Sequence, residues 1–331
     1  MTEPRITSGG LTAAQADEVL ALAEAARLAD GVAPLSEHGM LRLRYDGSDG
    51  GRDFIVMTGG EIAGYAYLDP PSGEGEGEVT GELVIHPRRR RQGLGRALTG
   101  ELVAAAAGYV LRLWAHGDLP AAAALARAAG FERFRALWQM RRSLDEPLDQ
   151  PVLPAGRELR TFVPGQDEDE WLSVNGRAFA KHPEQGGWTR HDLELREREP
   201  WFDPAGFFIA TRDGRMTGFH WTKVHDPSPG GDEDQQSLGE VYVVGVDPVE
   251  QGSGLGRALT LTGLRYLRDI GVGQVMLYVD EDNIPAVKMY EALGFTRAKV
   301  DAMYRSAGPG ERPPGTPRDR GVQSPRTPLA G

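Results

Sequence analysis

Two short segments of this chain combine residue types and a spacing suited to binding a phosphate group. The first reads IHPRRRRQGLGRALT over residues 85–99, and the second reads VDPVEQGSGLGRALT over residues 246–260. Each runs from β-branched residues through a proline turn into an amphipathic helix pattern. The glycines, Gly93 with Gly95 and Gly254 with Gly256, let the backbone approach a ligand and direct N–H groups at it, with the positive end of a helix dipole behind them. Each segment is predicted to hold a pyrophosphate.

The glycine spacing separates these loops from other nucleotide-binding loops. Neither contains the Gly-Lys-Ser/Thr of a P-loop, and neither completes the G-x-G-x-x-G of a dinucleotide fingerprint. Both fit [R/Q]-x-x-G-x-G, beginning at Arg90 and Gln251, which resembles the acetyl-CoA loop of the GCN5-related N-acetyltransferase (GNAT) family. One copy alone would be equally compatible with an ordinary strand-to-helix turn. Two copies in matching context favour the ligand, and the resemblance implies acetyl-CoA as acetyl donor and no metal.

A second repeated pattern lies downstream of each loop. Ala-Ala-Gly-Phe ends at Phe131, and Ala-Leu-Gly-Phe ends at Phe295. Glycine suits the left-handed position at the end of a helix, and the phenylalanine can pack on the next strand. The chain is therefore interpreted as a tandem duplication. We expect an N-terminal domain over residues 1–145, a linker over 146–158 rich in proline and acidic residues, a C-terminal domain over 159–305 and a disordered tail over 306–331.

The two copies differ where chemistry would occur. Aligning the loop prolines and the Gly-Phe pairs gives three matched positions: Val79 with Glu240, Ala126 with Tyr290, and Leu119 with Asn283. The second copy carries an ionisable or hydrogen-bonding side chain at all three, although Glu78 and Asp118 lie one residue from two of the first copy's positions. The C-terminal domain is therefore predicted to be catalytic, and the N-terminal domain to be non-catalytic.

These residue types suit acetyl transfer to an amine. An amine is mostly protonated at neutral pH, so a carboxylate such as Glu240, or a water that it holds, must remove a proton before nitrogen attacks a thioester. Tyr290 could then protonate the leaving thiolate. A backbone N–H of residues 244–246 could stabilise the oxyanion, and Gly245 could mark a β-bulge that frees this donor. Each candidate also has a structural interpretation: Glu240 on a solvent-facing strand, Tyr290 in the core or on a helix surface, and Asn283 as a helix cap.

The elements that position these residues follow from hydrophobic periodicity. In the first half we expect helices over 13–30, 96–107 and 121–129, and strands over 41–45, 53–58, 61–68, 77–85 and 110–115. In the second half we expect helices over 257–269 and 284–293, and strands over 207–211, 215–224, 240–246 and 274–279. This order predicts an α/β fold with mixed sheets covered by helices on both faces.

Composition narrows the class of protein. The 331 residues contain no cysteine, which excludes disulfides and cysteine-based metal sites, and they contain no apolar run long enough to span a membrane. The formal net charge of −11 argues against a general nucleic-acid binder. With no signal-peptide pattern at the start, the sequence predicts a cytoplasmic enzyme, and we expect a monomer with no membrane partner.

Four segments of the second half carry a closer resemblance: FAKHPEQGGWT, GFHWTKVH, GEVYVVGVDP and LYVDEDNIPAVKMYEALGF. They resemble the mycothiol synthases, tandem acetyltransferases of actinobacteria, over about residues 1–305. The resemblance implies acetylation of the cysteinyl amine of a glycosyl-inositol thiol, desacetyl-mycothiol. It implies substrate contacts at Glu37, Glu184, Lys223, Glu240 and Tyr278, although Glu184 and Lys223 could also be surface charges.

The same resemblance implies the residues that contact acetyl-CoA. In the second domain these are Val244, Gly245, Val246, Gln251, Gly252, Ser253, Gly254, Leu255, Gly256, Arg257, Asn283, Ile284, Pro285, Ala286, Val287 and Lys288. In the first domain they are Leu83, Val84, Ile85, Arg91, Gln92, Gly93, Leu94, Gly95 and Arg96. Three alternatives stay open: an acetyltransferase of another amine such as an aminoglycoside or a peptide, an acetyl-CoA-binding module without turnover, and a structural protein. The acidic segment 226–237 and the tail have no assigned role.

Overall fold

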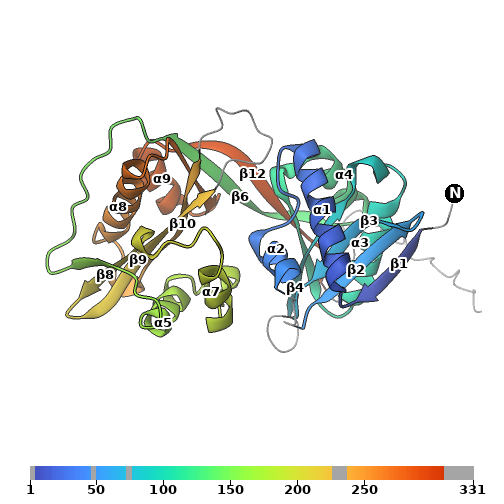
Figure 1. Ribbon diagram of the computed structural model, residues 1–331, viewed down its shortest axis with the longest axis horizontal. Helices are drawn as coiled ribbons and strands as arrows, with labels where there is room; N and C mark the ends of the chain where they lie inside the picture. Colours follow the sequence, from blue (N-terminus) through green and yellow to red (C-terminus); the bar gives the residue numbers. More distant parts are fainter. Residues whose placement is uncertain (1–3, 46–49, 72–76, 226–236, 309–331) are drawn as a thin grey trace, which may run out of the picture. The chain divides into compact units, whose positions relative to one another are not determined.

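The structure, a computed structural model, describes residues 4–45, 50–71, 77–225 and 237–308. Most of the acidic segment and of the C-terminal tail singled out above therefore lies outside the described residues. The chain divides into two units, the first comprising residues 1–134 with 303–331 and the second comprising residues 135–302. Each unit is a mixed α/β structure, which confirms the predicted fold class (Figure 1).

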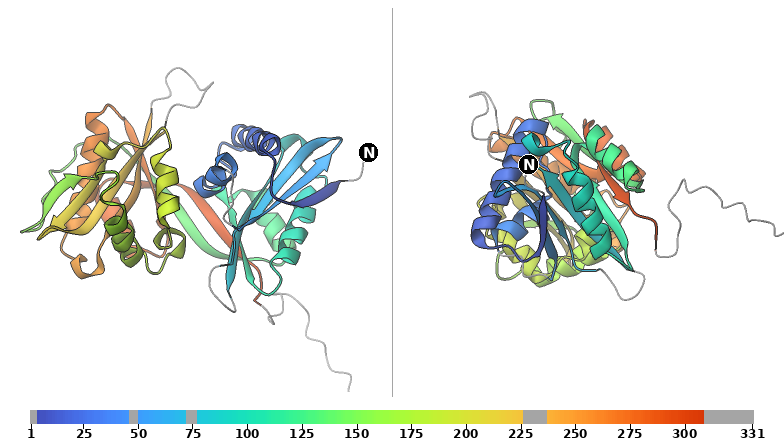
Figure 2. Two further views of the ribbon diagram at one scale, coloured as in Figure 1. Left: turned by 60° about the horizontal axis from the view of Figure 1, so that its bottom comes forward. Right: turned by 90° about the vertical axis from the view of Figure 1, so that its right-hand side faces the viewer.

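Unit 1 is built on the sheet order β1-β2-β3-β4-β5. Its elements are β1 (Arg5–Gly9), α1 (Ala13–Asp30), α2 (Glu37–Arg44), β2 (Arg52–Thr58), β3 (Glu61–Leu68), β4 (Glu78–Ile85), α3 (Leu94–Ala105), β5 (Val110–Ala115) and α4 (Pro120–Ala128). Helices α1 and α2 pack on one face through a cluster that includes Val19, Leu43 and Tyr65. Figure 2 shows α3 and α4 on the opposite face.

Unit 2 repeats this plan with more helices before its central strands. It contains β6 (Glu132–Ser143), β7 (Glu158–Thr161), α5 (Glu168–Ala178), α6 (Pro183–Gly186), α7 (Arg190–Glu197), β8 (Phe207–Arg212), β9 (Arg215–His225), β10 (Leu238–Val246), α8 (Leu255–Asp269), β11 (Gln274–Asp280), α9 (Ile284–Ala292) and β12 (Thr296–Arg305). The strand order is β12-β6-β11-β10-β9-β8-β7. Helices α8 and α9 cover one face of this sheet, and α5 and α7 cover the other (Figure 1).

The last strand of each sequence repeat, β6 or β12, crosses into the other unit. Residues 135–143 of β6 belong to unit 2, where β6 pairs antiparallel with β11 from Leu137–Asp280 to Ser143–Gln274. Residues 303–305 of β12 belong to unit 1, where the N–H of Ser306 donates to the carbonyl of Leu111 at 2.8 Å. Both strands were missing from the predicted elements.

One predicted strand is wrong. The alternation Leu41-Arg42-Leu43 favours a strand at residues 41–45, but these residues lie in α2. Ser36 caps this helix by accepting from the N–H of Gly39, and Leu41, Arg42 and Leu43 are all buried. The environment supplied by the rest of unit 1 therefore outweighs the local pattern.

Candidate active site

The glycine loop of unit 2 presents unsatisfied N–H groups at the start of α8. Gly254 is the N-cap in the left-handed region at φ 88°, and it offers no side chain to accept from the first turn. Among the described residues, none accepts a hydrogen bond from the N–H groups of Gly252, Gly254, Gly256 or Arg257. A helix N-terminus with several free donors binds anions, so this loop fits the pyrophosphate of acetyl-CoA.

Strand β10 separates from β11 before the chain reaches the glycine loop. The parallel pairing runs from Leu238–Gln274 to Val241–Leu277 and stops there, although β10 continues to Val246. Alternate backbone N–H groups between Val243 and Val246 therefore point into the opening between the two strands. The backbone N–H groups of residues 244–246, predicted from the sequence to include the oxyanion donor, belong to this stretch.

The predicted bulge lies at a different residue. Gly245 pairs regularly with Phe219, whereas the register of β9 and β10 shifts between Val241 and Val243, so that Tyr242 is the extra residue. Residue 245 is restricted to glycine by packing, because a Cβ there would lie 2.5 Å from the Phe219 ring. The prediction of a bulge at Gly245 is thus wrong, and the bulge sits two residues beyond Glu240.

The bulge also corrects the alignment of the two halves. In unit 1 the parallel pairing of β4 with β5 ends at Gly81–Leu113, the position of Val241–Leu277 in unit 2. Glu240, one residue earlier, therefore corresponds to Thr80 and not to Val79, because Tyr242 has no counterpart in β4. Neither residue of unit 1 is ionisable, so the contrast between the halves stands.

Glu240 is only 7% exposed, so the interpretation as a solvent-facing strand residue is wrong. It lies directly opposite Lys223 of β9, and opposite residues of antiparallel strands share a face. The Lys223 ammonium, also buried, lies 4.2 Å from the ring centre of Trp201 and 5.1 Å from that of Tyr242. Both aromatic residues pack on the α5–α7 side of the sheet. Glu240 and Lys223 therefore point to that side.

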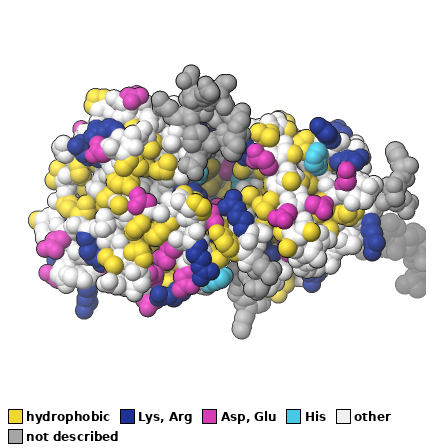
Figure 3. All heavy atoms as spheres, in the orientation of Figure 1, with side chains coloured by type: hydrophobic (Ala, Val, Ile, Leu, Met, Phe, Trp, Pro, Cys, Tyr) yellow, Lys and Arg dark blue, Asp and Glu magenta, His cyan; other side chains and the backbone are white. Residues whose placement is uncertain are grey.

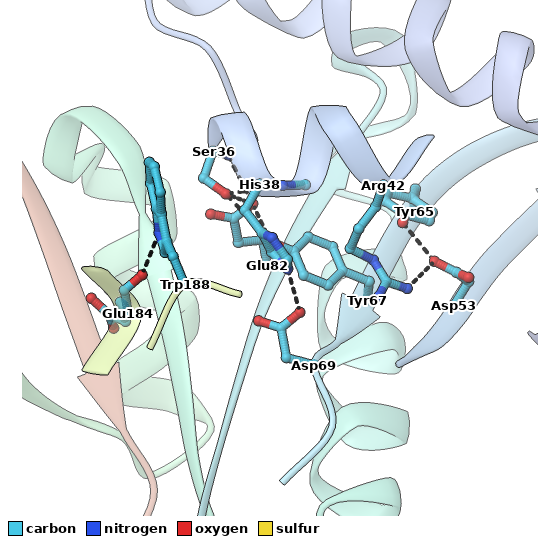
Figure 4. Close-up of polar contacts among 11 residues, drawn as sticks. Ser36, His38, Arg42, Asp53, Tyr65, Tyr67, Asp69, Glu82, Glu184 and Trp188 are labelled. Carbon is cyan, nitrogen blue, oxygen red and sulfur yellow. Dashed lines mark hydrogen bonds and ion pairs between the residues drawn. The ribbon is translucent and has the colours of Figure 1, made fainter. Parts of the chain in front are cut away.

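The remaining substrate candidates of unit 2 lie on the same face. Val275, Leu277 and Val279 of β11 point into the core under α8 and α9, so Tyr278 and Asp280 point to the α5–α7 side. The Tyr278 hydroxyl accepts from Gln139 at 2.9 Å. Glu184 is held by Arg135, whose guanidinium donates to it at 2.7 Å and also binds Asp280. The indole N–H of Trp188 donates to the Glu184 carbonyl at 3.0 Å (Figure 4). Arg135 and Asp280 were not singled out from the sequence.

Tyr290 points to the opposite face from Glu240. It belongs to the core cluster under α8 and α9, and its ring packs edge-on against Phe295 with centres 5.7 Å apart. Burial raises the pKa of Tyr290 to about 12, and no described residue hydrogen-bonds its hydroxyl. The hydroxyl therefore stays protonated at neutral pH. A group placed in the opening between β10 and β11 could be reached from both faces.

The structure confirms the interpretation of Asn283 as a helix cap. It is the N-cap of α9, and its side chain accepts from the N–H of Ala286 at 3.3 Å. The capped turn begins the segment 283–288 that the sequence assigned to acetyl-CoA. Leu119 caps α4 at the matching position of unit 1 without a side-chain hydrogen bond, so the two halves differ there as expected.

Unit 1 contains a buried carboxylate that serves a different purpose. Glu82 of β4, shown with Ser36 and Tyr67 in Figure 4, accepts hydrogen bonds from the Ser36 N–H at 2.9 Å and the Tyr67 hydroxyl at 3.0 Å. It also accepts a hydrogen bond from His116 at 2.9 Å. Burial opposes its ionisation, but the charge and hydrogen bond of His116, together with the hydrogen bonds from Ser36 and Tyr67, hold the pKa of Glu82 below its usual value. Glu82 therefore anchors the N-terminus of α2, whose first residue is the substrate candidate Glu37.

Comparison with known proteins identifies the family. Residues 174–295 match the acetyltransferase (GNAT) family model, and residues 50–133 match a second acetyltransferase (GNAT) domain model. The chain is 59% identical to the mycothiol acetyltransferase of Thermobispora bispora, with 87% of this chain and 95% of that protein covered. It is also 59% identical to that of Thermomonospora curvata, with 92% and 98% covered. The chain belongs to the mycothiol acetyltransferase family.

Solved structures agree with this assignment at the level of the fold. A GNAT protein of Sphaerobacter thermophilus matches with a TM-score of 0.61 at 26% identity, covering 91% of this chain and 95% of that one. A tandem GNAT protein from the clavulanic acid pathway matches with a TM-score of 0.67 at 22% identity, covering 91% and 98%. Two GNAT domains in tandem are therefore shown, as the repeated glycine loops predicted.

GNAT acetyltransferases use acetyl-CoA, and the described residues include no cluster of three or more side chains suited to a metal ion. None of the described helices is long and apolar enough to cross a membrane. On the face drawn in Figure 3, Lys and Arg side chains lie among Asp and Glu side chains.

Proposed function

We propose that this protein transfers the acetyl group of acetyl-CoA to the cysteinyl amine of desacetyl-mycothiol, and that unit 2 performs the reaction. The proposal rests on its relatives' shared name and on one observation above all: a buried carboxylate, Glu240, lies on β10 next to the point where β10 leaves β11. Unit 1 has Thr80 at that position.

Acetyl-CoA supplies a thioester whose carbonyl carbon the amine attacks. Glu240 removes the proton that the substrate ammonium carries, because only the neutral amine is nucleophilic. Backbone N–H groups of residues 244–246 stabilise the oxyanion in the opening. The C–S bond then breaks, and Tyr290, on the α8–α9 side, donates its proton to the departing thiolate. The acetylated nitrogen loses its surplus proton to solvent, and solvent returns a proton to Tyr290. Burial raises the pKa of Tyr290 to about 12, which keeps the proton on the hydroxyl at neutral pH until the thiolate leaves but also makes the phenol a weaker acid.

Substrate selection is assigned to the α5–α7 face of unit 2. Glu184, Lys223 and Tyr278 lie on the same side of the sheet as Glu240 and offer an anion, a cation and a phenol. The hydroxyl groups of a sugar and an inositol can accept from or donate to such groups. Glu37, the first residue of α2 in unit 1, is proposed as a substrate contact on the sequence resemblance alone. The sequence repeats 1–145 and 159–305 are the proposed domains, joined by 146–158, and the first is proposed to bind acetyl-CoA without catalysing.

The decisive experiment follows thiol release from acetyl-CoA in the presence of desacetyl-mycothiol. The matched variant is Glu240→Gln, which keeps shape and hydrogen bonding but removes the proton acceptor. We expect turnover to fall by about 10² or more at neutral pH with little change in acetyl-CoA binding. Near-normal turnover of the variant with an unchanged pH profile would overturn the role of Glu240. Faster acetylation of an aminoglycoside or a peptide amine by the wild type would overturn the substrate.

A further inference from the structure

The proposed base has a partner that the sequence did not suggest. His225, the last residue of β9, places Nε2 at 2.7 Å from Oε2 of Glu240. Its position two residues beyond Lys223 puts it on the same face of the sheet as Glu240. No described residue hydrogen-bonds the other carboxylate oxygen, Oε1. One oxygen is thus fixed, and the other is left for a ligand.

We propose that His225 is a positioning residue for the base, an inference that rests on the function proposed above. Its Nε2–H donates to Oε2 and holds the carboxylate so that Oε1 meets the substrate ammonium. A base must lie within hydrogen-bond reach of the proton it removes, so fixing its rotation contributes directly to the rate. Glu240 is buried at 7% exposure, whereas the His225 side chain is 35% exposed, so the pair connects the buried base to the surface.

The comparison with unit 1 supports a functional role for the pair. Asp69 corresponds to Lys223, because its N–H donates to the carbonyl of Thr80, the counterpart of Glu240. Two residues further, where unit 2 has His225, unit 1 has Pro71. Unit 1, which has Thr80 in place of Glu240, therefore also lacks a histidine at the position that matches His225. A histidine that served only to end the strand would not be expected to occur only in the unit that carries the proposed base.

The protonation of His225 adds a second effect. Protonated His225 forms an ion pair that favours the ionised form of Glu240, whereas neutral His225 gives only a hydrogen bond. Other groups around the carboxylate are Lys223 from β9, the Tyr278 phenol from β11 and, on β10 itself, Tyr242, whose hydroxyl accepts from Arg196 of α7.

Two variants separate the hydrogen bond from the charge. His225→Gln places an amide N–H near the position of Nε2 but cannot become a cation. His225→Ala removes both. The control is His191→Gln, which removes an exposed imidazole of α7. The assay measures kcat with desacetyl-mycothiol, and KM for acetyl-CoA, from about pH 5.5 to about pH 9.

We expect His225→Ala to lose about tenfold or more in kcat, with KM for acetyl-CoA unchanged and partial rescue by added imidazole. His225→Gln should stay within about threefold of wild type above pH 8, but its activity should fall at a higher pH on the acid side, because Glu240 has lost its cationic partner. His191→Gln should match wild type.

Wild-type kcat and an unchanged pH profile in both His225 variants would overturn the inference. If His225→Ala does not fold, the pH at which the activity of His225→Gln falls on the acid side decides by itself whether the inference holds. A fully active Glu240→Gln, or a wild type inactive on desacetyl-mycothiol, overturns the proposed function and this inference with it. An active wild type, an inactive Glu240→Gln and unaltered His225 variants overturn only this inference.

Discussion

The glycine loops of the two units have nearly the same backbone, with Gly93 at φ 84° and Gly254 at φ 88° as N-caps of α3 and α8. Even Arg91, at φ 63°, adopts the left-handed conformation that Gly252 adopts at φ 78°. Non-glycine residues rarely accept this conformation, and such strain persists mainly where a ligand requires the geometry. The loop geometry that we propose to bind phosphate is therefore present in both units.

The strand that precedes each loop differs between the units. β4 pairs regularly with β3 from Gly64–Ile85 to Leu68–Gly81, whereas β10 contains the extra residue Tyr242. A bulge changes the direction of neighbouring side chains. Glu240 precedes this bulge in unit 2, while the buried carboxylate of unit 1, Glu82, is committed to Ser36, Tyr67 and His116. We propose that both copies have kept ligand binding and that one copy has kept the catalytic groups.

The largest effect should come from breaking one loop at a time. Gly93→Val and Gly254→Val both place a β-branched side chain at a left-handed N-cap with open space around it, so the backbone strain, about 1–2 kcal/mol, is matched. The side chain should also block the approach of the pyrophosphate. We expect Gly254→Val to abolish acetyl transfer and Gly93→Val to retain most of it. Equal loss in two folded variants would show that unit 1 takes part in catalysis.

A smaller effect should follow from removing the substrate-facing charges of unit 2. Glu184→Ala or Lys223→Ala should lose roughly 1.5–3 kcal/mol, or about 10- to 100-fold in kcat/KM, on desacetyl-mycothiol. Free cysteine or a cysteine amide, which lack the sugar and inositol, should be affected far less. The comparison of both substrates on each variant is the measurement. Equal losses on both substrates would mean that these residues support the fold or the reaction centre instead.

The smallest effect concerns stability in acid. His220 is fully buried in unit 2, donates its Nδ1–H to the Leu259 carbonyl at 2.8 Å, and has a pKa lowered by burial to about 4. The matching residue of unit 1 is Ala66. Because the unfolded histidine protonates near pH 6.5, stability is complete above about pH 6.5 and is lost as pH falls toward 4, by up to about 1.4 kcal/mol per pH unit.

Tryptophan fluorescence during urea unfolding measures this loss, since every tryptophan except Trp114 lies in unit 2. His220→Asn keeps a donor near Nδ1 and removes the titration, so its unfolding free energy should depend less on pH between 6.5 and 4. The same pH dependence in variant and wild type would exclude His220 as the cause and leave the carboxylates of both units.

Much of this molecule could be predicted from local sequence. Helix α1 and strands β3 and β5 have the predicted bounds: α1 and β5 follow a repeat that matches a buried face, and β3 is an apolar run buried on both faces. The glycine loops were recognisable because a left-handed N-cap and free N–H groups depend on neighbouring residues alone. The catalytic candidates Glu240 and Tyr290 followed from comparing the two copies of one pattern.

Other features depend on residues far apart in the chain, and only the tertiary structure decided them. Helix α2 forms where leucines alternate, because Ser36 is held by Glu82 of a distant strand. The bulge at Tyr242 appears only when β10 is paired with β9, and it moves the counterpart of Glu240 to Thr80. His225 becomes the partner of Glu240 only across that same pair of strands. Sequence determined which residues could act, and strand pairing determined which of them meet, because register is a property of two segments and not of one.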